Sequence, residues 1–359
     1  MSTFGVEEEF LLADPETGRP VPAATEVLKA AWEEPAPGAV HPELSQTQVE
    51  AATVPCATLD ELEHELMAGR ARLAAAASSC GVWLLPSGTS PLGGSAEPVD
   101  APRFAEIAGR YAEVVRDYQA CGCHVHVGVL DRETAVAVGN HLRPWLPTLL
   151  ALAVNSPYHD GRDTGYASWR IVQQSRFPGA GVPPWFRDAH EYDERVARLV
   201  DSGVLVDESQ SFWLVRPSPT WPTVELRVAD TAVDVSGALL QATLSRALVE
   251  TALNDLSLGR EAPPLDDQVL AAGVWSAARY GLGGPGVHPV RACRVPATEL
   301  LDELIVRVAP ALAEVGDLAA ARELFAGVLR RGTGAERQRA VGEPFDVVRL
   351  LAIGVSYED

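Results

Sequence analysis

The segment 121–129, CGCHVHVGV, alternates between two kinds of side chain. Successive side chains of a β-strand point to opposite faces, so His124 and His126 share one face with Gly122 and Gly128, while cysteine and valine fill the other. A strand with one apolar face must pack that face against a core. The pattern therefore predicts a sheet that is covered on one side and carries imidazoles on the other.

A second alternating segment is the acidic stretch 5–12, GVEEEFLL. On a strand, Glu7 and Glu9 lie on one face together with Gly5. Glu8 falls on the opposite face, among apolar side chains, and we assign it no role. The stretch predicts a strand that presents two carboxylates to the same side.

A third segment, 224–228, reads VELRV and places Glu225 and Arg227 together, opposite three aliphatic side chains. If the polar faces of the three strands converge, several carboxylates meet a histidine in one place. Such groups repel one another unless cations lie between them. Because the ligands are mainly oxygen atoms, they favour Mg²⁺ or Mn²⁺ over Zn²⁺.

Each of these patterns also has a simpler interpretation. A Glu-x-Glu strand is often a solvated face, a His-x-His strand is often a structural pair, and Glu-x-Arg is a common ion pair of small energetic consequence. Their joint occurrence on three strands is what favours a metal site. Neither GxxxxGK[ST] nor GxGxxG is present, so nucleotide chemistry would have to use another kind of site.

The stretch 43–54 predicts a further extended segment. Glu43 and Glu50 are seven residues apart, which puts them on opposite faces of an unbroken strand. Either a bulge or bend separates them, or only one is a ligand. Glu50 is the stronger candidate, because it shares a face with Gln46 and Gln48.

Composition excludes several classes of function. The 359 residues include 49 acidic and 29 basic side chains, for a formal net charge of −20. Such acidity repels phosphate backbones and anionic lipid surfaces, so we expect no nucleic-acid or membrane partner. The chain has no long apolar run or leader pattern, and its five cysteines are sparse, which together predict reduced thiols in a cytoplasmic protein.

The expected secondary structure is α+β with a mostly antiparallel sheet, because strands are grouped in the first two thirds and do not alternate regularly with helices. The sheet-forming part is about 1–232, and the part 233–359 is helical in pattern. Thr58 and Glu61 form a capping box that opens one helix. Strands are also expected at 82–86, 211–215 and 223–229, and helices at 59–80, 103–119, 132–155 (broken near two prolines), 189–201, 236–258, 266–280, 298–313 and 318–330.

Five segments together resemble the glutamate-cysteine ligase type 2 family, the YbdK-like carboxylate-amine ligases. They are GVEEEFLL (5–12), HPELSQTQVE (41–50), CGCHVHVG (121–128), DGRDTGYASWR (160–170) and VELRVAD (224–230). The resemblance implies a single catalytic domain over 1–359 with a glutamine-synthetase-like fold, in which a curved sheet flanked by helices holds ATP and Mg²⁺. It also implies that ATP activates a carboxylate as an acyl phosphate, which an amine then converts to an amide.

The same resemblance implies roles for individual residues. The metal ligands would be Glu7, Glu9, Glu43, Glu50, His124 and Glu225. Three arginines would bind the nucleotide or the reacting groups, and the last two of them would act in catalysis: Arg162, Arg170 and Arg227. Weak glutamate-cysteine ligase activity, giving γ-glutamylcysteine, ADP and phosphate, is the expected reaction. The chain is shorter than the large bacterial glutamate-cysteine ligases, which leaves their lid and cysteine pocket without counterparts.

Two other functions remain open at this point. One is a metal-dependent hydrolase that uses His124 and His126, and the other is a homologue that binds nucleotide without catalysis. For the ligase we expect that Glu7→Gln and Glu225→Gln abolish ATP turnover and leave the fold intact. The substrates would be small molecules, an amino-acid carboxylate and an amine, and the helical last third leaves a homodimer open.

Overall fold

The central element of the protein is a seven-stranded antiparallel sheet. The computed structural model describes residues 2–33 and 37–354. The strands run in the order β2-β3-β1-β5-β9-β8, and β4 also pairs with β1. Their bounds are β1 (Phe4–Ala13), β2 (Ala39–Pro42), β3 (Gln48–Ala52), β4 (Trp83–Leu85), β5 (Gly122–Gly128), β8 (Val215–Pro217) and β9 (Thr223–Asp230).

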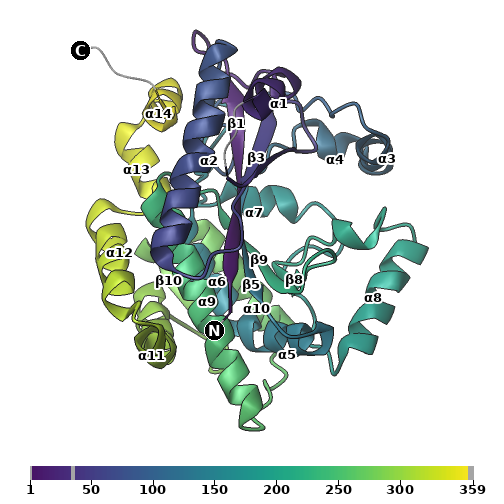
Figure 1. Cartoon of the computed structure of the whole chain (residues 1–359), viewed down its shortest axis with the longest axis vertical. Coiled ribbons are helices and arrows are strands. Elements are labelled where there is room, and N and C mark those ends of the chain that lie inside the picture. The colour runs from purple at the N-terminus through teal and green to yellow at the C-terminus, as the bar shows by residue number, and fades with distance from the viewer. Residues whose placement is uncertain (1, 34–36, 355–359) are drawn as a thin grey trace.

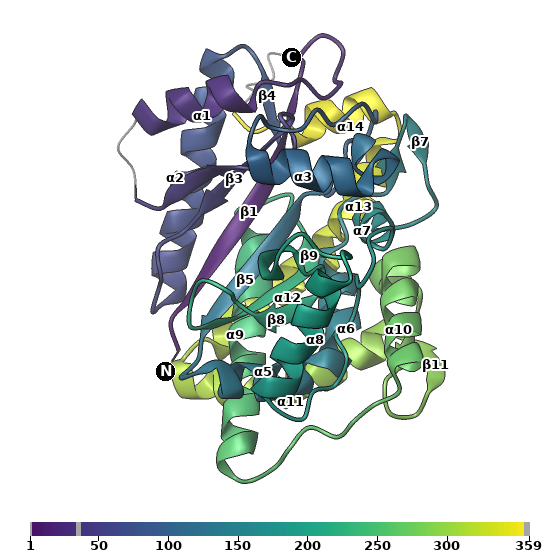
Figure 2. The same ribbon diagram turned by 90° about the vertical axis from the view of Figure 1, so that its right-hand side faces the viewer.

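Helices cover the apolar face of this sheet. Figures 1 and 2 show α2 (Leu59–Ser79), α9 (Val235–Ser257) and α12 (Leu318–Arg331) on one side, and α3 (Pro102–Tyr111) and α8 (Ala189–Asp201) on the other. The buried side chains of β5, which include Cys123, Val125 and Val127, belong to the same core cluster as α9. Alternation in the sequence therefore decides which face of each strand is packed by helices.

The remaining helices complete the shell. They are α1 (Ala24–Glu33), α4 (Glu113–Arg116), α5 (Arg132–Leu142), α6 (Leu146–Ala153), α7 (Trp169–Gln174), α10 (Asp267–Tyr280), α11 (Ala297–Val315), α13 (Gly334–Val341) and α14 (Pro344–Leu351). The capping box at Thr58 is present: the Glu61 N–H donates to the Thr58 hydroxyl oxygen, and the Glu61 carboxylate accepts from the backbone N–H groups of Ala57 and Thr58. The break between α5 and α6 lies at the predicted prolines, where a short 3₁₀ turn spans Arg143–Trp145.

The structure corrects four of the expected elements. Within the stretch 43–54 only β3 is a strand, because residues 43–47 form the loop that joins it to β2. The expected helix 103–119 is interrupted at Ala112, whose φ is 47°. The strand expected at 211–215 lies instead at Val215–Pro217, which is β8. The part after residue 234 is not purely helical, because β10 (Pro285–His288) and β11 (Cys293–Pro296) form a hairpin. Such a short hairpin has too few residues for a clear period of two.

The predicted α+β fold with a mostly antiparallel sheet is confirmed. All strands of the large sheet lie between residues 4 and 230, as the sequence predicts, and α9 to α14 follow them. One core cluster runs from Phe4 on β1 to Ala335 on α13, so the helical part packs directly on the sheet. No helix within the described residues is long and apolar enough to span a bilayer.

Candidate metal and substrate site

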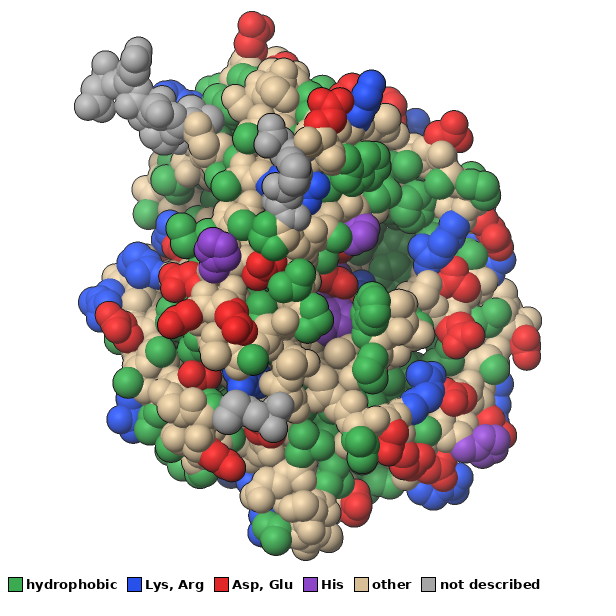
Figure 3. Space-filling view, viewed as in Figure 1, with side chains coloured by type: hydrophobic (Ala, Val, Ile, Leu, Met, Phe, Trp, Pro, Cys, Tyr) green, Lys and Arg blue, Asp and Glu red, His purple; other side chains and the backbone are tan. Residues whose placement is uncertain are grey.

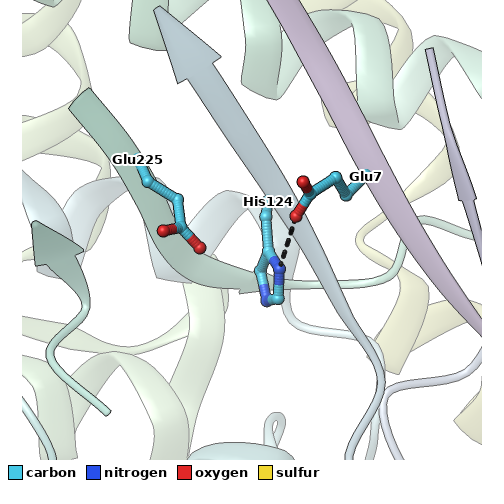
Figure 4. A group of neighbouring side chains, drawn as sticks. All are labelled: Glu7, His124 and Glu225. Carbon is cyan, nitrogen blue, oxygen red and sulfur yellow. Dashed lines mark ion pairs between the residues drawn. The ribbon is translucent and has the colours of Figure 1, made fainter. Parts of the chain in front are cut away.

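The predicted ligands meet on the polar face of the sheet because of its register. Glu7 of β1 pairs with His124 of β5, and Glu9 pairs with Glu50 of β3. On the other side of β5, Glu225 of β9 pairs with His126. Figure 4 shows the side chains of Glu7, His124 and Glu225 pointing toward one another from three neighbouring strands.

Glu7 is the carboxylate that contacts both histidines. Its oxygens lie 3.5 Å from His124 Nδ1 and 3.3 Å from His126 Nε2. Burial acts in the opposite direction, but the two imidazoles lower the pKa of Glu7 well below its usual range. Burial lowers the pKa of His124 to about 4, with Arg227 acting in the same sense. His124 is therefore neutral at physiological pH, as a metal ligand must be.

A second acidic group lies on the β3 side of His124. The ring Nε2 is 3.6 Å from Glu9 Oε1, and Glu50 faces Glu9 across the strand pair. Burial and the carboxylates of Glu43, Glu7 and Glu9 raise the pKa of Glu50 well above its usual range. Burial, together with Glu9, also raises the pKa of Glu43 to about 7. These carboxylates cannot all be ionised at neutral pH without a counter-charge.

Glu43 reaches this group from the loop between β2 and β3. The strand ends at Pro42 and resumes at Gln48, so the rule of opposite faces does not apply across the break. Within the loop, the Ser45 and Thr47 hydroxyls are hydrogen-bonded to each other at 2.8 Å. The structure shows the bend between the two glutamates, and within the described residues Glu50, but not Glu43, belongs to a set of three possible ligands. The ligand role of Glu43 stays a prediction.

The residues present fit divalent cations. Two sets of three ligand atoms lie within 4.8 Å of one another: Glu7, His124 and Glu225 in the first, and Glu9, Glu50 and His124 in the second. Among the described residues, His124 Nε2 is buried and has no hydrogen-bond partner. Hard carboxylate oxygens with a single imidazole are a donor set for Mg²⁺ or Mn²⁺. We name the first set the β9-side group, because Glu225 lies on β9, and the second set the β3-side group, because Glu50 lies on β3.

Glu225 is held by a residue that the sequence analysis missed. Arg216 of β8 donates to it from Nε at 2.8 Å and from Nη2 at 3.3 Å, and Arg227 contacts the same oxygen, Oε1, that accepts from Nη2. Although burial opposes it, Arg227 and Arg216 lower the pKa of Glu225 well below its usual range. The misplaced strand at 211–215 hid Arg216, because its pairing with Glu225 follows only from the register of β8 with β9.

This contact changes the expectation for Glu225→Gln. The amide would leave Arg216 and Arg227 buried with less compensating charge, so we expect the free energy of unfolding to fall by about 2 kcal/mol. Loss of turnover is expected as well. Urea denaturation of this variant beside Glu7→Gln, whose carboxylate is a quarter exposed, measures the difference. Equal stability of the two variants would contradict the structural role of Glu225.

Arg170 lies behind the site and is fully buried. Its Nη2 donates to the backbone oxygen of Arg227 at 3.1 Å, and its Nη1 is 3.9 Å from Asp230. A Cβ at Gly122 would lie 2.4 Å from Arg170 Nη2, so only glycine permits this packing on β5. The guanidinium is enclosed by protein, and it supports the charge of Glu9 from within.

Asp230 at the end of β9 fixes the segment that carries Arg170. Its carboxylate accepts hydrogen bonds from the Asn155 N–H at 2.8 Å, from the Ser156 hydroxyl at 2.7 Å and from the Ser168 hydroxyl at 2.8 Å. The sequence analysis assigned no role to Asp230, and the only signal for it was its place in the 224–230 segment.

Arg162 is not part of the group that the sheet assembles. It lies on β7 (Arg162–Asp163), which pairs with β6 (Tyr158–His159), and its side chain is exposed. Its position therefore differs from that of Arg227, which contacts Glu225 and lies 3.4 Å from His124 Nδ1. Of the three predicted arginines, Arg162 thus lies on a hairpin, Arg170 in a buried layer and Arg227 on the face of the site.

Two cavities reach the ligand face. The larger has a volume of about 870 Å³, is mostly apolar, and includes Glu7 and His126 among its lining residues. The smaller, of about 130 Å³, is lined by Glu9, Glu43 and Arg227 at one end. Figure 3 shows the surface hollowed between the parts that carry α3 and α8. Ligands of two kinds could thus approach the same carboxylates from separate openings.

Two solved structures share the fold of this chain. Over 98% of this chain and 87% of the other, the structure superposes on a glutamate–cysteine ligase from Francisella tularensis in complex with AMP, with a TM-score of 0.72 and 13% identity. A bifunctional glutathione synthetase from Pasteurella multocida gives a TM-score of 0.70 at 16% identity, over 98% of this chain and 52% of that one. These likenesses concern the fold.

Sequence similarity establishes the family. Residues 3–343 match glutamate-cysteine ligase family 2, and the chain belongs to it. A relative from Saccharopolyspora erythraea with the provisional name glutamate–cysteine ligase 2-2 is 56% identical over 98% of this chain and 91% of its own length. One from Nocardia farcinica, provisionally named glutamate–cysteine ligase 2-1, is 44% identical over 98% of this chain and 91% of its own length. The resemblance found in the five segments is confirmed.

Proposed function

We propose that this protein is an ATP-dependent carboxylate–amine ligase that forms an amide through an acyl phosphate. The observation that carries the proposal is the pair of carboxylate groups that share His124 on the polar face of the sheet. Family membership and the AMP complex of the Francisella tularensis neighbour support it. Glutamate and cysteine, giving γ-glutamylcysteine, ADP and phosphate, are the first substrates to test, because relatives carry that provisional name.

The two cavities support separate binding places for the nucleotide and for the other two substrates. The larger, mostly apolar cavity suits the flat base of a nucleotide, whose phosphates would then reach the β9-side group through Glu7. The smaller cavity would hold the reacting carboxylate and amine beside the β3-side group. Bound Mg²⁺ would neutralise phosphate oxygens and hold the transferred phosphoryl group in line with its acceptor.

The side chains of the protein bind and orient rather than react covalently. A substrate carboxylate oxygen bonds to the γ-phosphorus of ATP, and the bond to ADP breaks. The amine nitrogen then bonds to the acyl carbon, phosphate leaves with its electron pair, and the nitrogen releases one proton. Arg227, beside Glu225 and His124, supplies positive charge where negative charge accumulates on the transferred phosphoryl group.

The arrangement of the histidines favours this reaction over metal-dependent hydrolysis. His126 Nδ1 is hydrogen-bonded to Thr223 Oγ1 at 2.9 Å, and its other nitrogen faces Glu7. Of the two histidines, only His124 belongs to a set of three possible ligands within the described residues. The other members of each set are carboxylates. A hydrolase that used both imidazoles on one metal would need a different donor set.

The test is a coupled phosphate-release assay across a panel of amino-acid carboxylates and amines. We expect release that requires Mg²⁺ or Mn²⁺, ATP, a carboxylate and an amine together, and that stops on chelation of the metal. Calorimetric titration of ATP in the presence of Mg²⁺ and of Zn²⁺ accompanies it. A protein that hydrolyses substrates without ATP would be a hydrolase, and one that binds ATP without any turnover would be a non-catalytic homologue.

The homodimer, the single-domain organisation and the cytoplasmic location stay predictions.

A further inference from the structure

The smaller cavity combines a charged end with an aromatic wall. Glu9, Glu43 and Arg227 lie at the end that faces the metal ligands. The wall is formed by four apolar or aromatic side chains from α3, from the segment before β5 and from the segment before β8: Phe104, Ile107, Tyr118 and Phe212. A cavity that is polar at one end and aromatic along one side suits a molecule with a polar head and an apolar side chain.

The aromatic wall is a packed layer rather than a set of mobile tips. The ring centroids of Phe177 and Phe212 are 4.4 Å apart, and those of Tyr118 and Phe177 are 4.8 Å apart in an edge-to-face arrangement. Tyr118 and Phe177 are buried, whereas Phe212 is half-buried and Phe104 on α3 is also half-buried. The layer therefore offers partly uncovered ring surface to the cavity, supported from behind by buried rings.

Two buried amide groups line the same cavity, and each has one atom without a hydrogen-bond partner among the described residues. Gln174 Oε1 and Gln210 Nε2 have no hydrogen bond among the described residues, although both side chains are only 6% exposed. Gln210 Oε1 accepts from the Val206 N–H at 2.6 Å, which leaves the NH₂ group as the free end. An unpaired buried acceptor and an unpaired buried donor are costly unless a ligand satisfies them.

We propose that this cavity binds the amine substrate, and that this substrate is an α-amino acid with an apolar side chain. The inference rests on the ligase function proposed above. Gln174 Oε1 accepts from the α-ammonium group, and Gln210 Nε2 donates to the α-carboxylate. The side chain of the amino acid packs on Phe104 and Phe212. Arg103 adds positive charge at the cavity lining, held by Asp207 at 2.7 Å.

The size of the side chain distinguishes this substrate from cysteine. A thiol on one carbon would leave most of the aromatic wall uncovered, whereas leucine, methionine or phenylalanine would cover it. Since burying such a side chain gains about 1.5–3 kcal/mol, the apolar amino acid is expected to bind about tenfold or more tightly than a polar one of the same shape.

Calorimetric titration tests this directly and does not depend on turnover. The full-length protein, with Mg²⁺ and a non-hydrolysable ATP analogue, is titrated with two isosteric pairs, leucine against asparagine and methionine against glutamine, and with cysteine. We expect the apolar member of each pair to bind about tenfold more tightly, and leucine more tightly than cysteine. Equal affinity within the pairs, tighter binding of cysteine, or no binding by any of them would overturn the proposal.

Variants locate the binding to this cavity. Gln174→Leu is expected to weaken leucine binding about tenfold while the affinity for the ATP analogue is unchanged. Gln173→Leu is the matched control, because Gln173 lies next to it on α7, is equally buried and also has an unpaired oxygen, but does not line the cavity. If Gln174→Leu fails to fold, Phe104→Ala serves instead, with an expected fall of the leucine-to-asparagine ratio below about threefold.

The failure of this inference differs from the failure of the ligase function. If phosphate release in the panel assay requires an amine but polar amino acids are preferred, the ligase stands and the inference is wrong. If leucine binds but no panel member supports phosphate release, the cavity is assigned and the reaction is wrong.

Discussion

Replacing Glu7 by Gln is expected to lower ATP-dependent phosphate release by about a thousandfold while the protein stays folded. Glu7 is a member of the β9-side group and lies against both His124 and His126. A neutral amide cannot supply the charge that a divalent cation requires, and the effect would fall on the position of the phosphates. Phosphate release at saturating substrates, with calorimetric titration of Mg²⁺, measures both consequences.

The control for this variant is Glu65→Gln on α2. Glu65 is a buried glutamate, and its carboxylate accepts from the Val54 N–H at 3.3 Å, but it belongs to neither ligand group. We expect its turnover to stay within about threefold of the wild type, since a residue outside both ligand groups affects turnover only through stability. Normal ADP and phosphate release by Glu7→Gln with the true substrates would show that the metal site is wrongly assigned.

A second large effect is expected at the buried ion pair between Glu8 and Arg70. Arg70 donates to the Glu8 carboxylate from Nε at 2.9 Å and from Nη2 at 2.6 Å. It also donates to the backbone oxygens of Ala232 and Val233, which join β9 to α9. Arg70→Met would leave a carboxylate that is 2% exposed without its partner, so we expect a loss of about 3–5 kcal/mol in the free energy of unfolding.

A double-mutant cycle separates the pair from its surroundings. Glu8→Leu, Arg70→Met and the two substitutions together are compared by urea denaturation. The combined variant should recover a large part of the loss, because an apolar pair of similar volume leaves no buried charge. A cost below about 1 kcal/mol for Arg70→Met would mean that water, rather than the ion pair, satisfies Glu8.

The Glu8 pair shows where sequence reasoning stopped short. Glu8 was placed correctly on the apolar face of its strand, but a charge in that position needs a buried partner. The partner was visible as a break in the apolar stripe of α2, where Leu62, Leu66, Arg70 and Leu73 follow a helical period. A pattern read one segment at a time does not show which helix covers which strand.

The candidate site divides in the same way. Alternation along three segments predicted that Glu7, Glu9, His124, Glu225 and Arg227 share one face, and the sheet register brings them together. Arg216 and Asp230 were missed because their contacts join elements whose pairing is not written in either segment. The resemblance implied that Arg162 binds a substrate carboxylate or phosphate, and its hairpin places it at the surface.

The sequence by itself determined the faces of the strands, the capped start of α2, the antiparallel α+β character and the placement of Glu7, Glu9 and Glu225 on the polar faces, because these follow from side-chain alternation and local hydrogen bonding. The tertiary structure alone decided the order of the strands, the bend that brings Glu43 to Glu50, and the enclosure of Arg170 behind the site. These depend on contacts between distant segments, whose free energies are set by register, burial and the desolvation of charge. The amide-lined cavity beside Glu9 is of this second kind, since α3, α7 and the segment before β8 each supply only part of it.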